Sequence, residues 1–400
     1  MSEVKKKRHF ILAMPTGSNL WVHISICALA IFGTIMIGSA SMGIVNGNNR
    51  ALFMIVAKQI AFVIVGYISM AVLANKFTVD GLKKKSFLIA IGITYLALLA
   101  CLLFKGVDGS QAWLRFSLLG QEVTIQPSEF AKIMAILVVA AYLGDVKKRF
   151  EKAKSLIVPP IVILLGMFLI VALLQTDFGS AVIIFLISCV CLLIPNHPQL
   201  KKFQVVLKIL FWIALPLVIY LVTPYGEKFI NILPIKQYQK DRFLAAFNPF
   251  YDKYGSGYQL VNSLISFATG GFLGTGFGTS IRKYTNFPAA NTDYILAILV
   301  EETGFLGFSL LMVFYGVILF QLLKNATRIK NERARVILIG CAMYLLIHMI
   351  FNIGGVTGLI PLTGVPLLMI SSGGSATMAF MSCIGISQAV LSAKERGEIK

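Results

Sequence analysis

Three carboxylates stand where a long apolar stretch of the sequence begins: Asp293, Glu301 and Glu302. Carboxylates inside or at the edge of a bilayer are costly, so they usually mark a transport pathway or a reactive site. Asp293 follows Asn291 and Thr292, however, and this order is also typical of a helix start, where a polar side chain caps the first turn and the helix dipole favours negative charge. The dipole would lower the pKa of Asp293 and burial would raise it, so a cap and a catalytic base both remain open.

Other charged residues lie beside apolar stretches and could share a site with Asp293. Glu129 and Lys132 are three residues apart and share one helix face, where they could form a self-contained ion pair or line a cavity. Asp177 lies between two short apolar stretches, where it could form an Asx turn or contact a ligand. Three cations could bind phosphate, or could instead be paired or extended towards the membrane surface: Lys58, Arg115 and Arg242.

The composition indicates a polytopic membrane protein. Of the 400 residues, 57% are hydrophobic and only 13% are charged, which leaves too little polar surface for a soluble protein of this length. The net charge of +19 falls in short clusters between apolar stretches, a pattern that does not suggest nucleic-acid binding. The six cysteines lie within apolar stretches, and no CxxC, HExxH, Walker A or GxSxG motif is present. The sequence therefore gives no support for a disulfide framework, a zinc site, an NTPase loop or a serine-hydrolase site.

The elements that must position these side chains are transmembrane helices, each needing about 20 mainly apolar residues. The sequence predicts an all-α fold of ten spans, with a basic segment at 1–19 before the membrane domain (20–393) and a tail at 394–400. The first stretch is longer than a signal-peptide core, so we expect it to be retained as a span. The ten predicted spans are 20–42, 52–74, 86–104, 126–144, 157–174, 178–195, 205–224, 291–322, 336–356 and 364–393.

The distribution of Lys and Arg predicts the orientation. Most of the 36 basic residues fall in the two termini and in alternate short loops, which places both termini in the cytoplasm by the positive-inside rule. The outer side then carries three irregular segments: 105–125, 175–179 and the large loop 225–290. Loops longer than about 15 residues usually carry function.

Within the large loop, residues 258–280 are apolar but broken by glycines, which predicts a re-entrant or interfacial segment packed against protein. Gly270, Gly274 and Gly278 recur at a spacing of four, which would allow close helix approach.

Depth can be predicted from helix length. A helix from Asp293 to Leu322 would be about 43 Å long, whereas the hydrocarbon core is about 30 Å thick. Asp293 is therefore expected near the outer headgroups, with Glu301 about 12 Å deeper. An outer cavity that holds carboxylates and cations would suit an anionic, lipid-anchored, sugar-like substrate better than an ion at the membrane midplane.

Six ordered motifs resemble signature segments of the SEDS family (shape, elongation, division and sporulation proteins, the FtsW/RodA group), and the resemblance spans about 20–393. They are QPSEFAK (126–132), QTDFGSA (175–181), YQKDRFLAAFNP (238–249), GYQLVNSLISFATGGFLGTGFG (257–278), FPAANTDYILAILVEETGFLG (287–307) and FNIGGVTGLIPLTGVPLLMISSGGS (351–375). The last of these looks more like the division-type FtsW branch than the RodA branch.

The resemblance implies a ten-helix fold and an inverting peptidoglycan glycosyltransferase that polymerises lipid II at the outer face of the bacterial cytoplasmic membrane. It also implies a class B penicillin-binding protein as partner, together with other membrane proteins of the division machinery. The essential aspartate of the family matches Asp293, and its other acidic motif positions match Glu129 and Asp177. On this interpretation Asp293 is the general base. The candidates for binding pyrophosphate or sugar in the cavity are Arg115, Glu129, Lys132, Asp177, Arg242 and Lys58.

A divalent cation (Mg or Mn) could assist, held largely by the substrate pyrophosphate, since no dedicated metal cage is visible. Glu301 and Glu302 stay unassigned, as supporting or structural residues.

The sequence departs from the family pattern at five positions. Asn291 stands where His is usual, Thr176 replaces a Pro, His348 stands where Gln is common, and Leu368 and Ser372 replace a Pro and a Tyr. The acidic positions are intact. Two other classes of function stay open: a lipid II flippase, which ten spans with broken helices would also fit, and a division scaffold without chemistry of its own.

Overall fold

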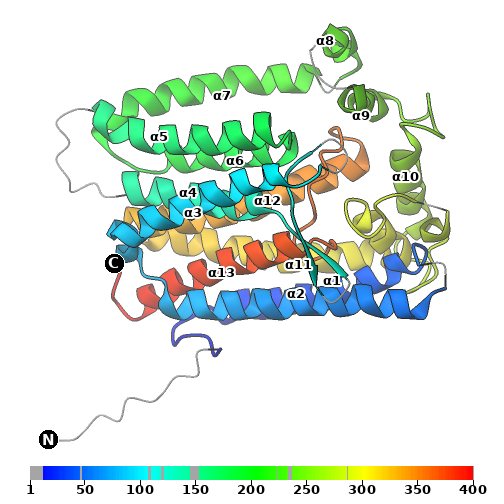
Figure 1. Ribbon diagram of the computed structural model, residues 1–400, viewed down its shortest axis with the longest axis horizontal. Helices are drawn as coiled ribbons and strands as arrows, with labels where there is room; N and C mark the ends of the chain where they lie inside the picture. The colour runs from blue at the N-terminus through cyan, green and yellow to red at the C-terminus, as the bar shows by residue number, and fades with distance from the viewer. Residues whose placement is uncertain are drawn as a thin grey trace, which may run out of the picture.

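The structure is a computed structural model that describes residues 12–45, 47–106, 110–118, 121–144, 153–221, 223–232, 237–285 and 287–399. Most of the basic N-terminal segment (1–11) and part of the fourth loop (145–152) lie outside the described residues. The long helices lie side by side along one direction, while α8, α9 and α10 gather at the end of the bundle away from the C-terminus (Figure 1).

A helix occupies each of the ten ranges predicted as spans. They are α1 (Leu20–Ser41), α2 (Asn49–Lys76), α3 (Lys85–Ala100), α4 (Pro127–Leu143), α5 (Ala153–Leu169), α6 (Phe178–Leu193), α7 (Lys201–Leu221), α11 (Ile295–Arg328), α12 (Glu332–Thr357) and α13 (Gly374–Glu395). Within the described part of the chain, seven helical stretches are long and apolar enough to cross a membrane. The fold is therefore that of a polytopic helical membrane protein, and the count of ten spans stays a prediction.

Shorter elements connect these helices. The large loop contains α8 (Glu227–Ile232), α9 (Gln237–Phe247) and α10 (Tyr258–Gly270). Among the described residues, the other connecting elements are five 3₁₀ segments and one π segment (η3): η1 (Val79–Lys83), η2 (Cys101–Leu103), η3 (Ile170–Leu174), η4 (Pro198–Leu200), η5 (Pro224–Gly226) and η6 (Arg282–Tyr284).

The first outer segment folds as a β-hairpin, which the all-α prediction did not include. Strands β1 (Leu114–Leu118) and β2 (Gln121–Ile125) pair antiparallel, with Arg115 opposite Thr124 and Ser117 opposite Glu122. The sequence carried only part of a hairpin signal: the second run, QEVTI, has three β-branched residues and a glycine precedes it, whereas the first run, LRFSL, has one aromatic residue and no β-branched one. The hairpin is fixed to the start of α13, because the hydroxyl of Ser375 donates to the carbonyl of Thr124 at 3.3 Å.

The tenth predicted span was wrong at its start. Residues 361–373, which we call the strap, are not helical, and α13 begins only at Gly374. Pro361 and Pro366 lack the N–H that a helix needs, and Gly364 has a φ of 72°. The strap is held from α11, where the Tyr315 hydroxyl donates to the carbonyl of Leu368.

The eighth predicted span is broken. Inside α11, Gly304 has φ 66° and ψ −167°, so the helix consists of two parts. The backbone groups that the break frees pair with the glycine-rich loop after α10, which keeps them satisfied at membrane depth. The pairs are Thr275 N with Glu301 O (2.9 Å), Gly276 N with Glu302 O (3.0 Å), Phe305 N with Gly271 O (2.9 Å) and Leu306 N with Phe272 O (3.1 Å).

Close backbone approach explains two of the three spaced glycines. A Cβ on Gly270 would lie 2.1 Å from the Val300 carbonyl oxygen, and one on Gly274 would lie 2.2 Å from that of Glu302. Gly278 has no atom within 4 Å of such a Cβ. The predicted close approach is thus confirmed for Gly270 and Gly274, and it was wrong for Gly278.

Two glycines of α11 provide a matched test of this break. Gly304→Ala should lower the free energy of unfolding by more than the roughly 1–3 kcal/mol of a residue held in a rare backbone conformation, because its Cβ would also lie 2.4 Å from Gly274 N and Phe272 O. Gly316→Ala meets nothing within 4 Å and should be neutral or stabilise the helix by roughly 0.5–1 kcal/mol. Thermal unfolding of both variants in detergent measures the difference. Equal midpoints would contradict the constraint at Gly304.

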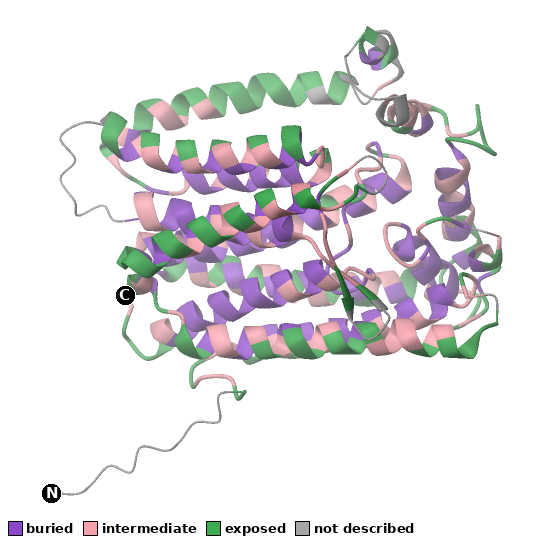
Figure 2. Cartoon of the chain, in the orientation of Figure 1, coloured by how far each residue is buried: buried purple, intermediate pink, exposed green. Residues whose placement is uncertain are grey.

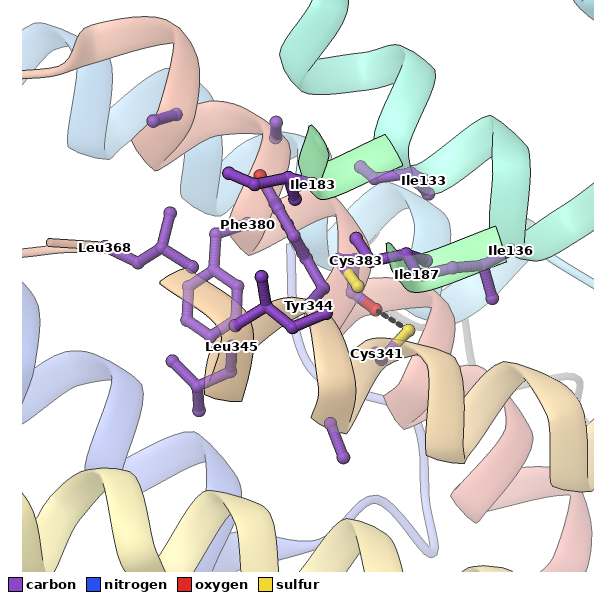
Figure 3. Packing of buried hydrophobic residues seen from close by; sticks show 14 of the residues in the cluster. Ile133, Ile136, Ile183, Ile187, Cys341, Tyr344, Leu345, Leu368, Phe380 and Cys383 are labelled. Atoms are coloured by element: carbon purple, nitrogen blue, oxygen red, sulfur yellow. Dashed lines mark hydrogen bonds between the residues drawn. The ribbon is translucent and has the colours of Figure 1, made fainter. Parts of the chain in front are cut away.

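Side chains pack the interior of the bundle and leave the outer faces apolar. Buried residues line the inward faces of the central helices, whereas α7 is exposed over much of its length, as expected for a lipid-facing helix (Figure 2). Tyr344, Phe380 and Leu368 pack between α12, α13 and the strap (Figure 3). Cys341 donates from its thiol to the Cys383 carbonyl at 3.6 Å. All six cysteines are free, and four of them are buried: Cys101, Cys191, Cys341 and Cys383.

Candidate functional site

Asp293 lies in a turn just before α11, not in the helix. The turn is closed by the N–H groups of Thr292 and Tyr294, which both donate to the carbonyl of Ala289 at 3.1 Å. Tyr294 is the N-cap residue, and its side chain makes no capping hydrogen bond. The alternative in which Asn291 or Thr292 caps the helix and Asp293 follows within its first turn was therefore wrong. The carboxylate of Asp293 has no role in capping α11.

The strap and α12 hold this turn by its backbone. Three consecutive carbonyls of the turn each accept a hydrogen bond from outside it. The donors are the Ser372 N–H to Asn291 (2.9 Å), the Ser371 hydroxyl to Thr292 (2.8 Å) and the Asn352 amide to Asp293 (2.9 Å). Because these bonds use main-chain oxygens, the Asp293 carboxylate is positioned without its own oxygens being consumed by them.

Arg242 of α9 is the cation next to Asp293. Its guanidinium donates to the Leu362 carbonyl at 3.3 Å. A Cβ on Gly364 would lie 3.6 Å from Asp293 Oδ2 and 3.9 Å from Arg242 Nη1, so the strap glycine lies against both groups. Burial raises the pKa of the Asp293 carboxyl, and the charge of Arg242 acts in the opposite direction. Two of the predicted site residues are thus brought together.

A cavity of about 380 Å³ adjoins Arg242. It is lined by Asp241, Arg242, Asp252 and Ser256, all from α9 or the turn that follows it. The Asp252 carboxylate accepts from the Ser256 N–H at 2.7 Å, which fixes that turn. The cavity is of the size that binds small polar ligands, and it carries both signs of charge.

Glu129 and Lys132 form a buried ion pair in α4. Lys132 Nζ lies 2.7 Å from Glu129 Oε1, with side-chain exposures of 1% and 2%. Lys132 Nζ also lies 3.2 Å from His348 Nε2, and the Tyr344 hydroxyl donates to Glu129 Oε2 at 3.0 Å. The ion pair that the spacing allowed is therefore present, and α12 contacts both of its members. Neither residue belongs to the described lining of the 380 Å³ cavity.

Asp177 is the N-cap of α6. Its Oδ1 accepts from the Ser180 N–H at 3.0 Å, and its Oδ2 accepts from the Gln126 amide at 2.8 Å. The turn role that the sequence left open is therefore present. The start of α6 also touches the strap, since a Cβ on Gly179 would lie 2.7 Å from the Thr363 carbonyl oxygen. Asp177 and Asp293 consequently lie near adjacent strap residues, 363 and 364.

Arg115 and Lys58 meet at the hairpin. Arg115 Nη1 lies 3.4 Å from Glu122 Oε1, and Lys58 Nζ donates to the Glu122 carbonyl at 2.8 Å. Both cations are thus engaged by one hairpin residue.

Glu301 and Glu302 make polar contacts that were not predicted from the sequence. The Glu301 carboxylate accepts from Ser266 (3.0 Å) and Ser280 (2.6 Å). Lys283 Nζ lies 2.9 Å from Glu302 Oε1, with both side chains fully buried. The signal for this pair was the two adjacent basic residues, Arg282 and Lys283, that follow the glycine-rich segment.

Asn352 was also missed. It lies four residues after His348 on the apolar helix α12, and this spacing of two polar residues on one helix face was its signal.

Comparison with known proteins assigns a family to nearly the whole chain. Residues 20–396 match the sequence model of the FtsW/RodA/SpoVE family, described as cell cycle proteins. The chain belongs to this family. The family predicted from the six motifs is therefore confirmed.

Curated relatives of this family member cover most of its length. It is 30% identical over 371 residues to a "Probable peptidoglycan glycosyltransferase FtsW" of Coxiella burnetii, covering 92% of this chain and 93% of the relative. A Bacillus subtilis protein of the same name is 31% identical over 381 residues, covering 90% of this chain and 87% of that protein. The FtsW names agree with the predicted division-type branch.

Solved structures show the same fold. A chain from "Structural coordination of polymerization and crosslinking by a peptidoglycan synthase complex" superposes with a TM-score of 0.70 at 22% identity, covering 94% of this chain and 98% of that one. The rod shape determining protein RodA of Thermus thermophilus gives a TM-score of 0.57 at 19% identity, covering 94% and 97%.

Proposed function

We propose that this family member is a peptidoglycan glycosyltransferase that polymerises lipid II into glycan strands for septal wall synthesis. One observation carries the proposal: the Asp293 carboxylate, raised in pKa by burial, lies beside Arg242, and Arg242 lines a polar cavity. The names of the relatives, which cover most of the chain, support the same activity.

The reaction joins two lipid-linked sugars. The growing strand on undecaprenyl pyrophosphate is the donor, and a 4-hydroxyl of lipid II is the acceptor. Asp293 accepts the hydroxyl proton as the oxygen attacks the anomeric carbon with inversion, and the bond to pyrophosphate breaks to release undecaprenyl diphosphate. Burial that raises the pKa of Asp293 makes it a stronger base, and such a base contributes about 10²–10⁴ in rate.

Among the predicted cations, Arg242 is the one that stabilises the negative charge of the leaving pyrophosphate. Its side chain is exposed and lines the cavity. Lys132 is buried against Glu129 and His348, and Arg115 is paired to the hairpin. A planar guanidinium also suits bidentate binding of phosphate oxygens.

A divalent cation is part of the proposal only through the substrate. The described residues contain no group of three or more His, Cys, Asp or Glu side chains arranged to hold a metal ion. Mg or Mn would therefore be held chiefly by the pyrophosphate, with Asp241 or Asp252 as a carboxylate ligand at the cavity. When bound, it would neutralise charge on the leaving group.

The proposal includes an orientation in the membrane and a partner protein. We expect both termini in the cytoplasm, the cavity facing outward, and a class B penicillin-binding protein cross-linking the strands. The structurally similar peptidoglycan synthase complex, in which polymerisation and crosslinking are coordinated, supports such a partner.

The test is lipid II polymerisation by the purified protein, with and without its transpeptidase, and lipid II flipping in vesicles. Glycan strands made by the wild type support the proposal. Flipping without polymerisation would support the transporter instead. No product from the protein–partner pair would favour a scaffold.

Arg242→Gln should shift the pH dependence of the reaction. The base must be ionised, so kcat rises with pH through the pKa of Asp293. Arg242 lowers that pKa, so its removal raises the pKa, and the acidic limb of kcat should move to higher pH. Polymerisation rates across pH for both proteins measure this, with Arg396→Gln, far along the chain at the C-terminal tail, as control. A midpoint that stays or moves lower contradicts the pairing.

A further inference from the structure

Two buried polar side chains on α12 face the strap. His348 and Asn352 are four residues apart, so they lie on one helix face, and they are 0% and 1% exposed. Polar residues buried in an apolar helix must be paired within the protein, so their partners show what they hold.

Asn352 joins the Asp293 turn to the strap. Its amide nitrogen donates to the Asp293 carbonyl at 2.9 Å and to the Val365 carbonyl at 2.9 Å. One side chain thereby uses both of its donor hydrogens to fix the backbone of Asp293 relative to the strap. The strap residue next to Val365 is Gly364, which lies against both Asp293 and Arg242.

His348 holds the next strap residue. Its Nδ1 lies 3.2 Å from the Pro366 carbonyl, which can only accept, so Nδ1 carries the hydrogen. Nε2 is then the acceptor for Lys132, 3.2 Å away. Lys132 is held in turn by Glu129 at 2.7 Å. These contacts run from α4 through His348 to the Pro366 carbonyl, and Asn352 separately holds the carbonyl next to it, that of Val365.

We propose that His348 and Asn352 are positioning residues for Asp293. They fix the strap at two consecutive carbonyls and thereby set the placement of Asp293 against Arg242. In this arrangement the Lys132–Glu129 pair acts through His348, not on the substrate. The proposal rests on the proposed function, and it gives a task to two residues that carry no chemistry of their own.

The experiment compares replacements that keep or remove the hydrogen bonds. Glutamine at 348 can donate an amide hydrogen to Pro366 and accept from Lys132, so His348→Gln should keep kcat within about 3-fold of wild type. His348→Leu and Asn352→Leu should lower kcat on the order of 10²-fold with KM unchanged, because a misplacement of about 1 Å can have that effect. Ile350→Leu, on the exposed face of the same helix, is the matched control.

The pH profile separates positioning from simple loss of folded protein. A loosened strap changes both causes that set the pKa of Asp293, its burial and its distance from Arg242, so the acidic limb of kcat moves in the leucine variants. Loss of folded protein scales the profile without moving it. Should His348→Leu fail to accumulate, Asn352→Ser, which is too short to bridge both carbonyls, gives the same comparison.

The outcomes are distinct. Reduced kcat with a shifted limb in the leucine variants, and near wild-type behaviour of His348→Gln, supports the inference. Wild-type kcat in the leucine variants, or equal loss in all three with an unmoved limb, overturns it. Suppose that wild type polymerises lipid II and Asp293→Asn does not. An overturning result in the leucine variants then contradicts only the positioning role, and the proposed function stands. If wild type makes no strands, the proposed function fails and the positioning role fails with it.

Discussion

Asp293→Asn should lower the rate of lipid II polymerisation by about 10²–10⁴-fold while the protein stays folded. The amide keeps the size of the side chain but cannot accept the proton of the attacking hydroxyl. The bond that holds residue 293 in place is made by its main-chain oxygen to Asn352, so the substitution leaves it intact. Initial rates of strand formation by the purified protein with its partner, at saturating lipid II, measure the loss.

Asp80→Asn is the matched control for that substitution. Asp80 is exposed, lies on the segment between α2 and α3, and pairs with Lys83. The same chemical change there should leave polymerisation at the wild-type rate. If Asp293→Asn retained more than about a tenth of the wild-type rate, the general-base role would be wrong, because removal of a general base should lower the rate by about 10²–10⁴-fold.

Hydrophobic length predicted the helices well because the bilayer imposes it. A span of about 20 apolar residues leaves few alternatives, and all ten predicted ranges contain a helix. The strap shows where this signal fails. Residues 364–370 are as apolar as a span, yet 367–370 are buried against protein. Irregular backbone there pairs with side chains such as Asn352 and Ser371. Hydropathy does not distinguish contact with lipid from contact with protein. The better signal is the set of residues that disfavour a helix: Pro361, Gly364 and Pro366.

The site residues were predicted from the sequence, but their contacts between helices were not. Asp293 and Arg242 were both chosen from the sequence, and the structure places them together. Glu129 and Lys132 are adjacent on one helix turn, so their pairing could be foreseen. Asn352 meets Asp293 from a helix 59 residues away, and no periodicity relates the two. Contacts of that kind depend on how helices pack, which the spacing along one helix does not encode.

Lys283→Met should destabilise the protein by about 3–5 kcal/mol, since it would leave the Glu302 carboxylate buried without its cation. Lys283 Nζ lies 2.9 Å from Glu302 Oε1, and both side chains are 0% exposed. The pair fastens the glycine-rich loop to the break in α11, with the Ser39 hydroxyl donating to Glu302 at 2.7 Å from α1. The free energy of unfolding in mixed micelles, from denaturant titration, measures the effect.

An exposed pair of nearly equal length isolates the contribution of burial. Lys83 and Asp80 are 2.8 Å apart, but their side chains are 52% and 83% exposed. Lys83→Met should therefore change stability by no more than about 1 kcal/mol. The double variant Lys283→Met with Glu302→Gln should recover much of the loss, because it removes the unpaired charge together with its partner. Equal effects at Lys283 and Lys83, or no recovery in the double variant, would show that charge burial at the α11 break is not what stabilises it.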